Sequence, residues 1–169
     1  MSYVTGPSSN APLVPVASGL AYRVDSPPGN ALVTRELADE LRRALEIFAR
    51  EAGFDERRPV GVFFKPGVVG HHQAGRAADI YEVEGKGLDC WKRRWDEAVR
   101  HGPHPASSEE RRMNLGWLLY KTLQMHGRWS QPYGYPIQLF GPWTRTEGPW
   151  TFISDRLLDA HRDHVHIAK

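Results

Sequence analysis

Cysteine is nearly absent from this sequence, since Cys90 is the only one among 169 residues. This excludes an internal disulfide and a zinc site built from several cysteine thiolates. Any zinc site in the chain must therefore use histidine and carboxylate ligands. The stretch LDCWKRRW around Cys90 is helix-like in composition, and we expect a buried thiol there with a structural role.

Long apolar runs are also missing, because no segment approaches the roughly 20 residues that a membrane-spanning helix needs. The first 30 residues combine neither a basic segment nor a continuous apolar one, so we expect no signal peptide. A strong excess of one sign of charge is missing as well: 22 Lys and Arg against 20 Asp and Glu leave a net charge of +2. This balance argues against a nucleic-acid partner, which favours a strongly basic surface.

The order of predicted elements indicates a mixed α+β fold, with a small antiparallel sheet flanked by helices. Residues 1–30 are expected to form an extended N-terminal arm and residues 31–169 the catalytic domain. Helical spacing of apolar residues marks four segments: 34–52, 89–100, 107–127 and 154–161. Strand-like patterns mark three: 59–65, 75–83 and 163–169. Strands and loops are expected over 129–153, where most aromatic side chains should be buried and one or two should line a cleft.

Predicted helix faces follow from the same spacing. Thr34 is the expected N-cap of the first helix, and Gly53 lies where its C-terminal glycine belongs. The apolar faces of the next two helices are expected to hold these residues: Trp91, Trp95 and Val99 in one, and Met113, Trp117 or Leu118, and Met125 in the other. A Ser107–Glu110 capping box is expected to start the latter helix.

Five of the eight histidines fall in two short clusters: His71 and His72, then His161, His164 and His166. On a strand, His164 and His166 face one way, whereas Val165 and Ile167 face the other. Burial of the aliphatic pair would fix this strand and direct both imidazoles into a cleft. That is the support that a preorganised metal site requires.

The segment from His72 to Asp79 complements this strand. If it contains a strand, Ala77 and Asp79 share a face, and the small Ala77 leaves room beside a metal held by Asp79. Gly75 allows the chain to turn so that His72 returns over the strand end. Together with His166, these residues supply two imidazoles and one carboxylate. Such a set leaves the fourth tetrahedral position of zinc open, which is typical of catalytic sites.

These segments match a known pattern in identity and spacing: His72, Gly75, Ala77 and Asp79, followed by His164 and His166. The pattern resembles the zinc peptidases of the D-Ala-D-Ala carboxypeptidase type, whose superfamily includes lysostaphin and the hedgehog amino-terminal domain. Residues 161–166 are also similar to the end of the penicillin-insensitive murein endopeptidases. The resemblance implies an antiparallel sheet that holds zinc, and hydrolysis of peptidoglycan stem peptides or cross-links.

Carried over by position, the resemblance implies three zinc ligands: His72, Asp79 and His166. His164 would hydrogen-bond the transition state from outside the coordination shell, with direct ligation as the alternative. Asp163 would be the general base, although on an alternating strand it reaches the site only if the chain bends there. Alternatively, Asp163 orients a histidine, and His161 either supplies the base or caps the preceding helix.

Two positions depart from the family. Gly70 stands two residues before His72, where the family usually has Ser. The upstream Arg that grips a substrate carboxylate in the carboxypeptidases has no match except Lys65. An endopeptidase, which cuts within a peptide or cross-link, does not need that grip.

The sequence therefore predicts a monomeric zinc metallopeptidase whose substrate is a peptidoglycan peptide. Without a signal peptide, we expect it to reach the cell wall after lysis or by non-classical export, with cytoplasmic cleavage of dipeptides as an alternative. Two other functions use the same residues. One is a zinc-binding module of the same fold without hydrolase activity. The other is a different metallohydrolase, such as a nuclease, against which the near-neutral charge argues.

Overall fold

The computed structural model describes seven ranges of the chain: 14–15, 32–54, 61–65, 70–100, 113–126, 138–147 and 153–168. Its strands are β1 (Val14–Pro15), β2 (Leu32–Val33), β3 (Val62–Lys65), β4 (Ala77–Val83), β5 (Lys86–Gly87), β6 (Gln138–Phe140) and β7 (Val165–Ala168). Its helices are α1 (Arg35–Glu51), α2 (Leu88–Arg100), α4 (Leu115–His126), α5 (Thr144–Glu147) and α6 (Asp155–Ala160). The predicted α+β class is confirmed.

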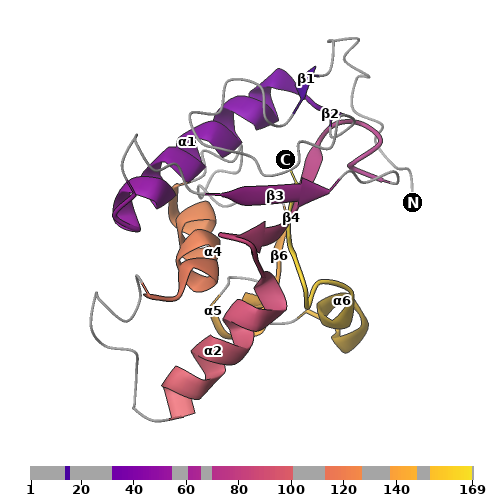
Figure 1. Ribbon diagram of the computed structural model, residues 1–169. Coiled ribbons are helices and arrows are strands. Elements are labelled where there is room, and N and C mark those ends of the chain that lie inside the picture. The colour runs from indigo at the N-terminus through magenta and orange to yellow at the C-terminus, as the bar shows by residue number, and fades with distance from the viewer. Residues whose placement is uncertain are drawn as a thin grey trace.

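The main sheet is antiparallel and has the order β3-β4-β7-β6, with β5 paired to β4 (Figure 1). Strand β7 is therefore flanked by β4 on one side and β6 on the other, although β6 and β7 are far from β4 in sequence. The β4–β5 hairpin turns through Glu84 and Gly85, both at positive φ. Glu84 is tied to Gly61 by two hydrogen bonds, which offset the strain of its backbone.

The register of the sheet places residues of β4, β7 and β6 opposite one another in rows, and two neighbouring rows differ in polarity. Asp79 of β4 lies opposite His166 of β7, which in turn lies opposite Phe140 of β6. The neighbouring row is apolar and consists of Ala78, Ile167 and Leu139. Since side chains alternate along a strand, the polar row and the apolar row face opposite sides of the sheet.

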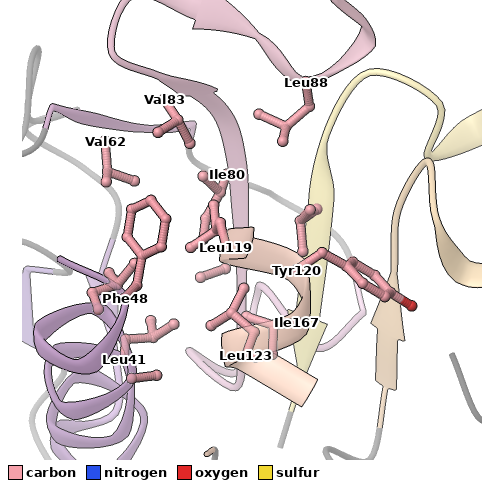
Figure 2. Close-up of a cluster of buried hydrophobic side chains, with 14 of the residues drawn as sticks. Leu41, Phe48, Val62, Ile80, Val83, Leu88, Leu119, Tyr120, Leu123 and Ile167 are labelled. Carbon is pink, nitrogen blue, oxygen red and sulfur yellow. The ribbon is translucent and has the colours of Figure 1, made fainter. Parts of the chain in front are cut away.

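The apolar side of the sheet packs against α1 and α4, which lie next to each other (Figure 1). Figure 2 shows side chains of α1, α4 and the strands converging in this core. The predicted apolar face of α1 is fully buried and contains Leu37, Leu41, Leu45 and Phe48. Thr34 caps this helix through a hydrogen bond that Leu37 N donates to its Oγ1, and Gly53 follows the last turn at positive φ, as predicted.

Two predictions about α2 are wrong in detail. Trp91 and Trp95 of α2 are buried, but Val99 is 42% exposed near the end of the helix. Cys90 is exposed rather than buried, because it lies off the face that Trp91 and Trp95 define. Its thiol accepts a hydrogen bond from the Arg93 guanidinium.

The apolar stripe predicted for 107–127 is also wrong at two positions. Met113 and Met125 are largely exposed, whereas Trp117 and Leu118 are buried as expected. Met113 precedes α4 and Met125 lies in its last turn, whereas the rest of α4 packs between α1, α2 and the sheet and is buried on most sides. A helix of this kind carries no single stripe that its sequence could reveal.

Several expectations fall on residues outside the described ranges. They include the Ser107–Glu110 capping box, most of 129–153, and all of the N-terminal arm except Val14–Pro15, which pairs with Leu32–Val33. Within the described ranges, every helix is too short or too polar to cross a membrane.

Candidate metal centre

The three predicted zinc ligands come together on the polar side of the sheet. His72 lies in the turn before β4, Asp79 on β4 and His166 on β7, and they offer donor atoms that all lie within 4.8 Å of one another. Asp79 Oδ1 is 2.8 Å from His166 Nδ1, and Asp79 Oδ2 is 3.2 Å from His72 Nε2. Two donors on a tetrahedral zinc ion are about 3.3 Å apart, so these spacings suit a zinc site.

The turn that carries His72 is fixed at both of its ends. Gly75 has a φ of 66° and donates its N–H to the His72 carbonyl over 2.9 Å. The Gly75 carbonyl accepts a hydrogen bond from Thr34 N, which attaches the turn to the start of α1. The predicted role of Gly75 is confirmed. The turn brings His72, rather than the adjacent His71, into the metal group.

The strand environment keeps Asp79 and His166 in place. Both residues are more than 90% buried, on strands that each have a neighbour on either side. Beside them, Ala77 lies opposite Ala168, and both are buried. Ala77 shares the face of Asp79, as predicted, and its small side chain limits crowding next to the ligands.

Residues of β6 support His166 in a way that sequence reasoning missed. Gln138 Oε1 is 3.2 Å from His166 Nε2, and the Phe140 ring lies nearly parallel to the imidazole at 6.1 Å. Leu139 between them is fully buried, which confirms the alternation of this strand. The sequence signal was the triplet Gln-Leu-Phe, but the surrounding Pro and Gly residues hid the register of so short a strand.

His164 lies beside the metal group and is not a member of it. Its Nδ1 is 2.9 Å from Asp163 Oδ1, and its ring stacks on Tyr81 at 4.6 Å. Its Nε2 is 3.9 Å from Asp79 Oδ1 and is thus turned toward the metal group. These contacts fit the predicted position outside the coordination shell better than direct ligation.

Asp163 lies on a bend that precedes β7, so the alternation of the strand does not govern its direction. Its side chain is 56% exposed, and its contact is with His164. This is the geometry of a carboxylate that orients a histidine, one of the two roles considered from the sequence. The general-base role of Asp163 stays a prediction.

His161 follows α6 and lies against the metal group. Its Nδ1 is 2.7 Å from the Leu157 carbonyl, which can only accept, so Nδ1 carries the proton and caps the helix end. Its ring centroid is 4.9 Å from that of His164 and 5.3 Å from that of His166. Burial lowers the pKa of His161, an effect that the hydrogen bond to Leu157 partly opposes.

The electrostatics of the group keep Asp79 ionised. Burial alone would raise the pKa of Asp79, but hydrogen bonds from His166 and His72 outweigh it and hold the pKa well below the usual carboxyl range. Burial and the charges of Asp79 and Asp163 raise the pKa of Tyr81, so its phenol stays protonated. An ionised carboxylate between two imidazoles is a suitable ligand set for zinc.

Comparison with protein-family models, with curated proteins and with solved structures gives no match to this chain. A functional assignment therefore depends on the geometry of the metal group and its neighbours.

Proposed function

We propose that this protein is a zinc-dependent peptidase that hydrolyses an amide bond in peptidoglycan stem peptides or cross-links. The observation that carries the proposal is the convergence of His72, Asp79 and His166 from a turn and two central strands. The same three residues are the ligands that the resemblance to the D-Ala-D-Ala peptidases implies. The sequence pattern and the three-dimensional cluster thus point to the same three residues.

The donor set suits zinc because it combines two imidazole nitrogens with one carboxylate and leaves room for a further ligand. When bound, zinc supplies Lewis-acid chemistry, which polarises a substrate carbonyl and makes water a nucleophile near neutral pH. The ligands are held by the sheet register and by the anchored turn before β4. Little rearrangement of the chain is then needed for the site to take up an ion.

Two neighbours of the ligands have the contacts that proton transfer and charge stabilisation need. The Nδ1–H of His161 is donated to Leu157, so its Nε2 is the nitrogen with a free lone pair and could accept a proton. Asp163 receives the Nδ1 proton of His164, which turns the Nε2 side of that ring toward Asp79. In this proposal His161 is the base and His164 contacts the developing oxyanion, with Asp163 orienting it.

The site also favours one type of peptidase over another. Gly70 stands where the carboxypeptidases that the sequence resembles have Ser, and the upstream Arg for a substrate carboxylate has only Lys65 as a counterpart. A terminal carboxylate is therefore a poor handle for this site, and we propose cleavage within a peptide or cross-link. Monomeric action on the cell wall after lysis or non-classical export is part of the same proposal.

Digestion of purified peptidoglycan followed by mass spectrometry of the muropeptides tests this function. We expect new products that differ by hydrolysis of one peptide bond, their loss after chelation, and their return with added zinc. The His72→Ala chain should give none of these products.

Two results would replace the proposal. Stoichiometric zinc uptake without hydrolysis of any wall preparation would favour a zinc-binding module, and nicking of plasmid DNA without wall hydrolysis would favour a nuclease.

A further inference from the structure

His166 is held through both of its ring nitrogens. Asp79 Oδ1 lies 2.8 Å from Nδ1, and Gln138 Oε1 lies 3.2 Å from Nε2. The residue is also more than 90% buried, and the Phe140 ring lies nearly parallel to the imidazole at 6.1 Å. The ring therefore has a single orientation, in which Nδ1 faces the metal group and Nε2 faces β6.

The orientation alone does not make His166 a ligand, because imidazole binds a metal only through a nitrogen without a proton. A neutral ring carries one proton, on either Nδ1 or Nε2. The Asp79 carboxylate lies against Nδ1 as an acceptor, so it draws that proton to the atom that a metal would need. An acceptor on the opposite side of the ring is required to favour the other tautomer.

Gln138 is positioned to be that acceptor. It projects from β6 on the same face as Phe140, since the intervening Leu139 is fully buried in the core. A hydrogen bond from His166 Nε2–H to Gln138 Oε1 leaves the lone pair on Nδ1, directed at Asp79 and His72. Partners of this kind commonly fix the tautomer of a metal-bound histidine.

We infer that Gln138 is a positioning residue that sets the tautomer of His166 and thereby allows zinc to bind through Nδ1. The inference rests on the metal centre of the proposed function but not on peptidase activity. It predicts that the amide oxygen of Gln138, rather than its bulk, determines the affinity for zinc.

Two substitutions of Gln138 separate the hydrogen bond from the shape of the side chain. Gln138→Met keeps a similar volume but removes the acceptor, and we expect zinc affinity to fall about 10- to 100-fold. Gln138→Glu retains an acceptor oxygen, and we expect wild-type affinity or tighter binding. Gln124→Met is the matched control, because this buried glutamine lies on α4, where it accepts from Lys121. It should bind zinc as the wild type does.

Zinc affinity is measured by competition with a chromophoric chelator, and the tautomer by ¹H–¹⁵N NMR of the metal-free chains, because zinc bound through Nδ1 would itself place the proton on Nε2. A protonated, slowly exchanging Nε2 of His166 is expected in the wild type and in Gln138→Glu, but not in Gln138→Met. The signal is assigned by its absence from a His166→Asn chain.

The outcomes distinguish this inference from the proposed function. Equal zinc affinity in the wild type and a folded Gln138→Met chain would overturn the inference alone, as would a failure of Gln138→Glu to retain affinity. A wild-type chain that takes up no zinc would overturn the proposed function together with it. Zinc uptake without peptidase activity would remove the peptidase assignment and leave the role of Gln138 in place.

Discussion

Asp79 and His166 lie opposite each other on β4 and β7, and a hydrogen bond of 2.8 Å joins Oδ1 to Nδ1 across 87 residues of sequence. Both strands are interior strands of the main sheet. The two side chains are therefore brought together by strand register, and only His72 depends on a loop. The core beneath the sheet thus supports the two residues at the centre of the group.

Replacement of Asp79 by Asn should abolish stoichiometric zinc binding. The substitution removes the negative charge between His72 and His166, and an amide is a much weaker zinc ligand than a carboxylate. We expect the metal content of the dialysed protein, measured by mass spectrometry, to fall to background. Asp159→Asn, the same change on the exposed surface of α6, should leave the metal content unchanged. Full zinc occupancy in Asp79→Asn would rule out this ligand set.

Zinc should stabilise the folded chain against heat. A ligand at 100 times its Kd adds about 2.7 kcal/mol to the free energy of unfolding when it binds only the folded state. For a chain of this length, such a gain raises Tm by roughly 5–10 °C. Differential scanning fluorimetry with zinc and with a chelator measures the shift. His72→Ala should show none, and a shift that persists in that variant would mean that the ion binds elsewhere.

His161 and Asp163 should differ in their contribution to catalysis. If His161 is the base, His161→Ala lowers kcat about 100-fold or more. Asp163→Asn should cost less, because the amide oxygen can still accept the Nδ1 proton of His164. Steady-state hydrolysis of a muropeptide by zinc-loaded variants gives the comparison. If Asp163→Asn lowers kcat more than His161→Ala does, the general base is Asp163.

Gly116→Ala should destabilise the helical side of the core. A Cβ at Gly116 would lie 2.5 Å from Trp91 Cβ and 2.8 Å from Trp143 Cη2, so α2 and α4 would have to separate. Overpacking of this kind costs about 1–3 kcal/mol, which exceeds the roughly 1 kcal/mol that Ala gains over Gly in a helix. We expect a lower midpoint in urea unfolding.

Gly87→Ala is the matched control for this substitution. Its Cβ would meet only the carboxylate of Asp89, which is the far end of a flexible side chain and can move away. We therefore expect a change within about 1 kcal/mol. Equal stability of the wild type and Gly116→Ala would show that α2 and α4 are less closely packed than described.

The parts of the fold that the sequence revealed are those with a strong local signal. The apolar spacing of α1 and the alternation Val165–Ile167 correspond to buried faces, and the motif from His72 to Asp79 corresponds to a turn followed by a strand. In each case the residues of one short segment are enough to predict its local structure. The three metal-group residues were accessible to sequence reasoning for this reason.

The parts that were missed depend on tertiary neighbours. Met125 was assigned to a buried face because α4 is apolar on most sides, and only its packing against α1, α2 and the sheet decides which positions remain exposed. Gln138 could not be linked to His166, because the pairing of β6 with β7 is a long-range property of the sheet.

The position of β7 between β4 and β6 has a consequence for biosynthesis. A nascent chain that has emerged only as far as β6 contains both neighbours of β7 but lacks the strand that joins them. Neither the apolar row through Ile167 nor the proposed ligand His166 is then available, so the sheet cannot close and the proposed metal site cannot form. This sheet can therefore close only after β7 has been synthesised, and a chain truncated before Val165 should be degraded rather than accumulate as an inactive protein.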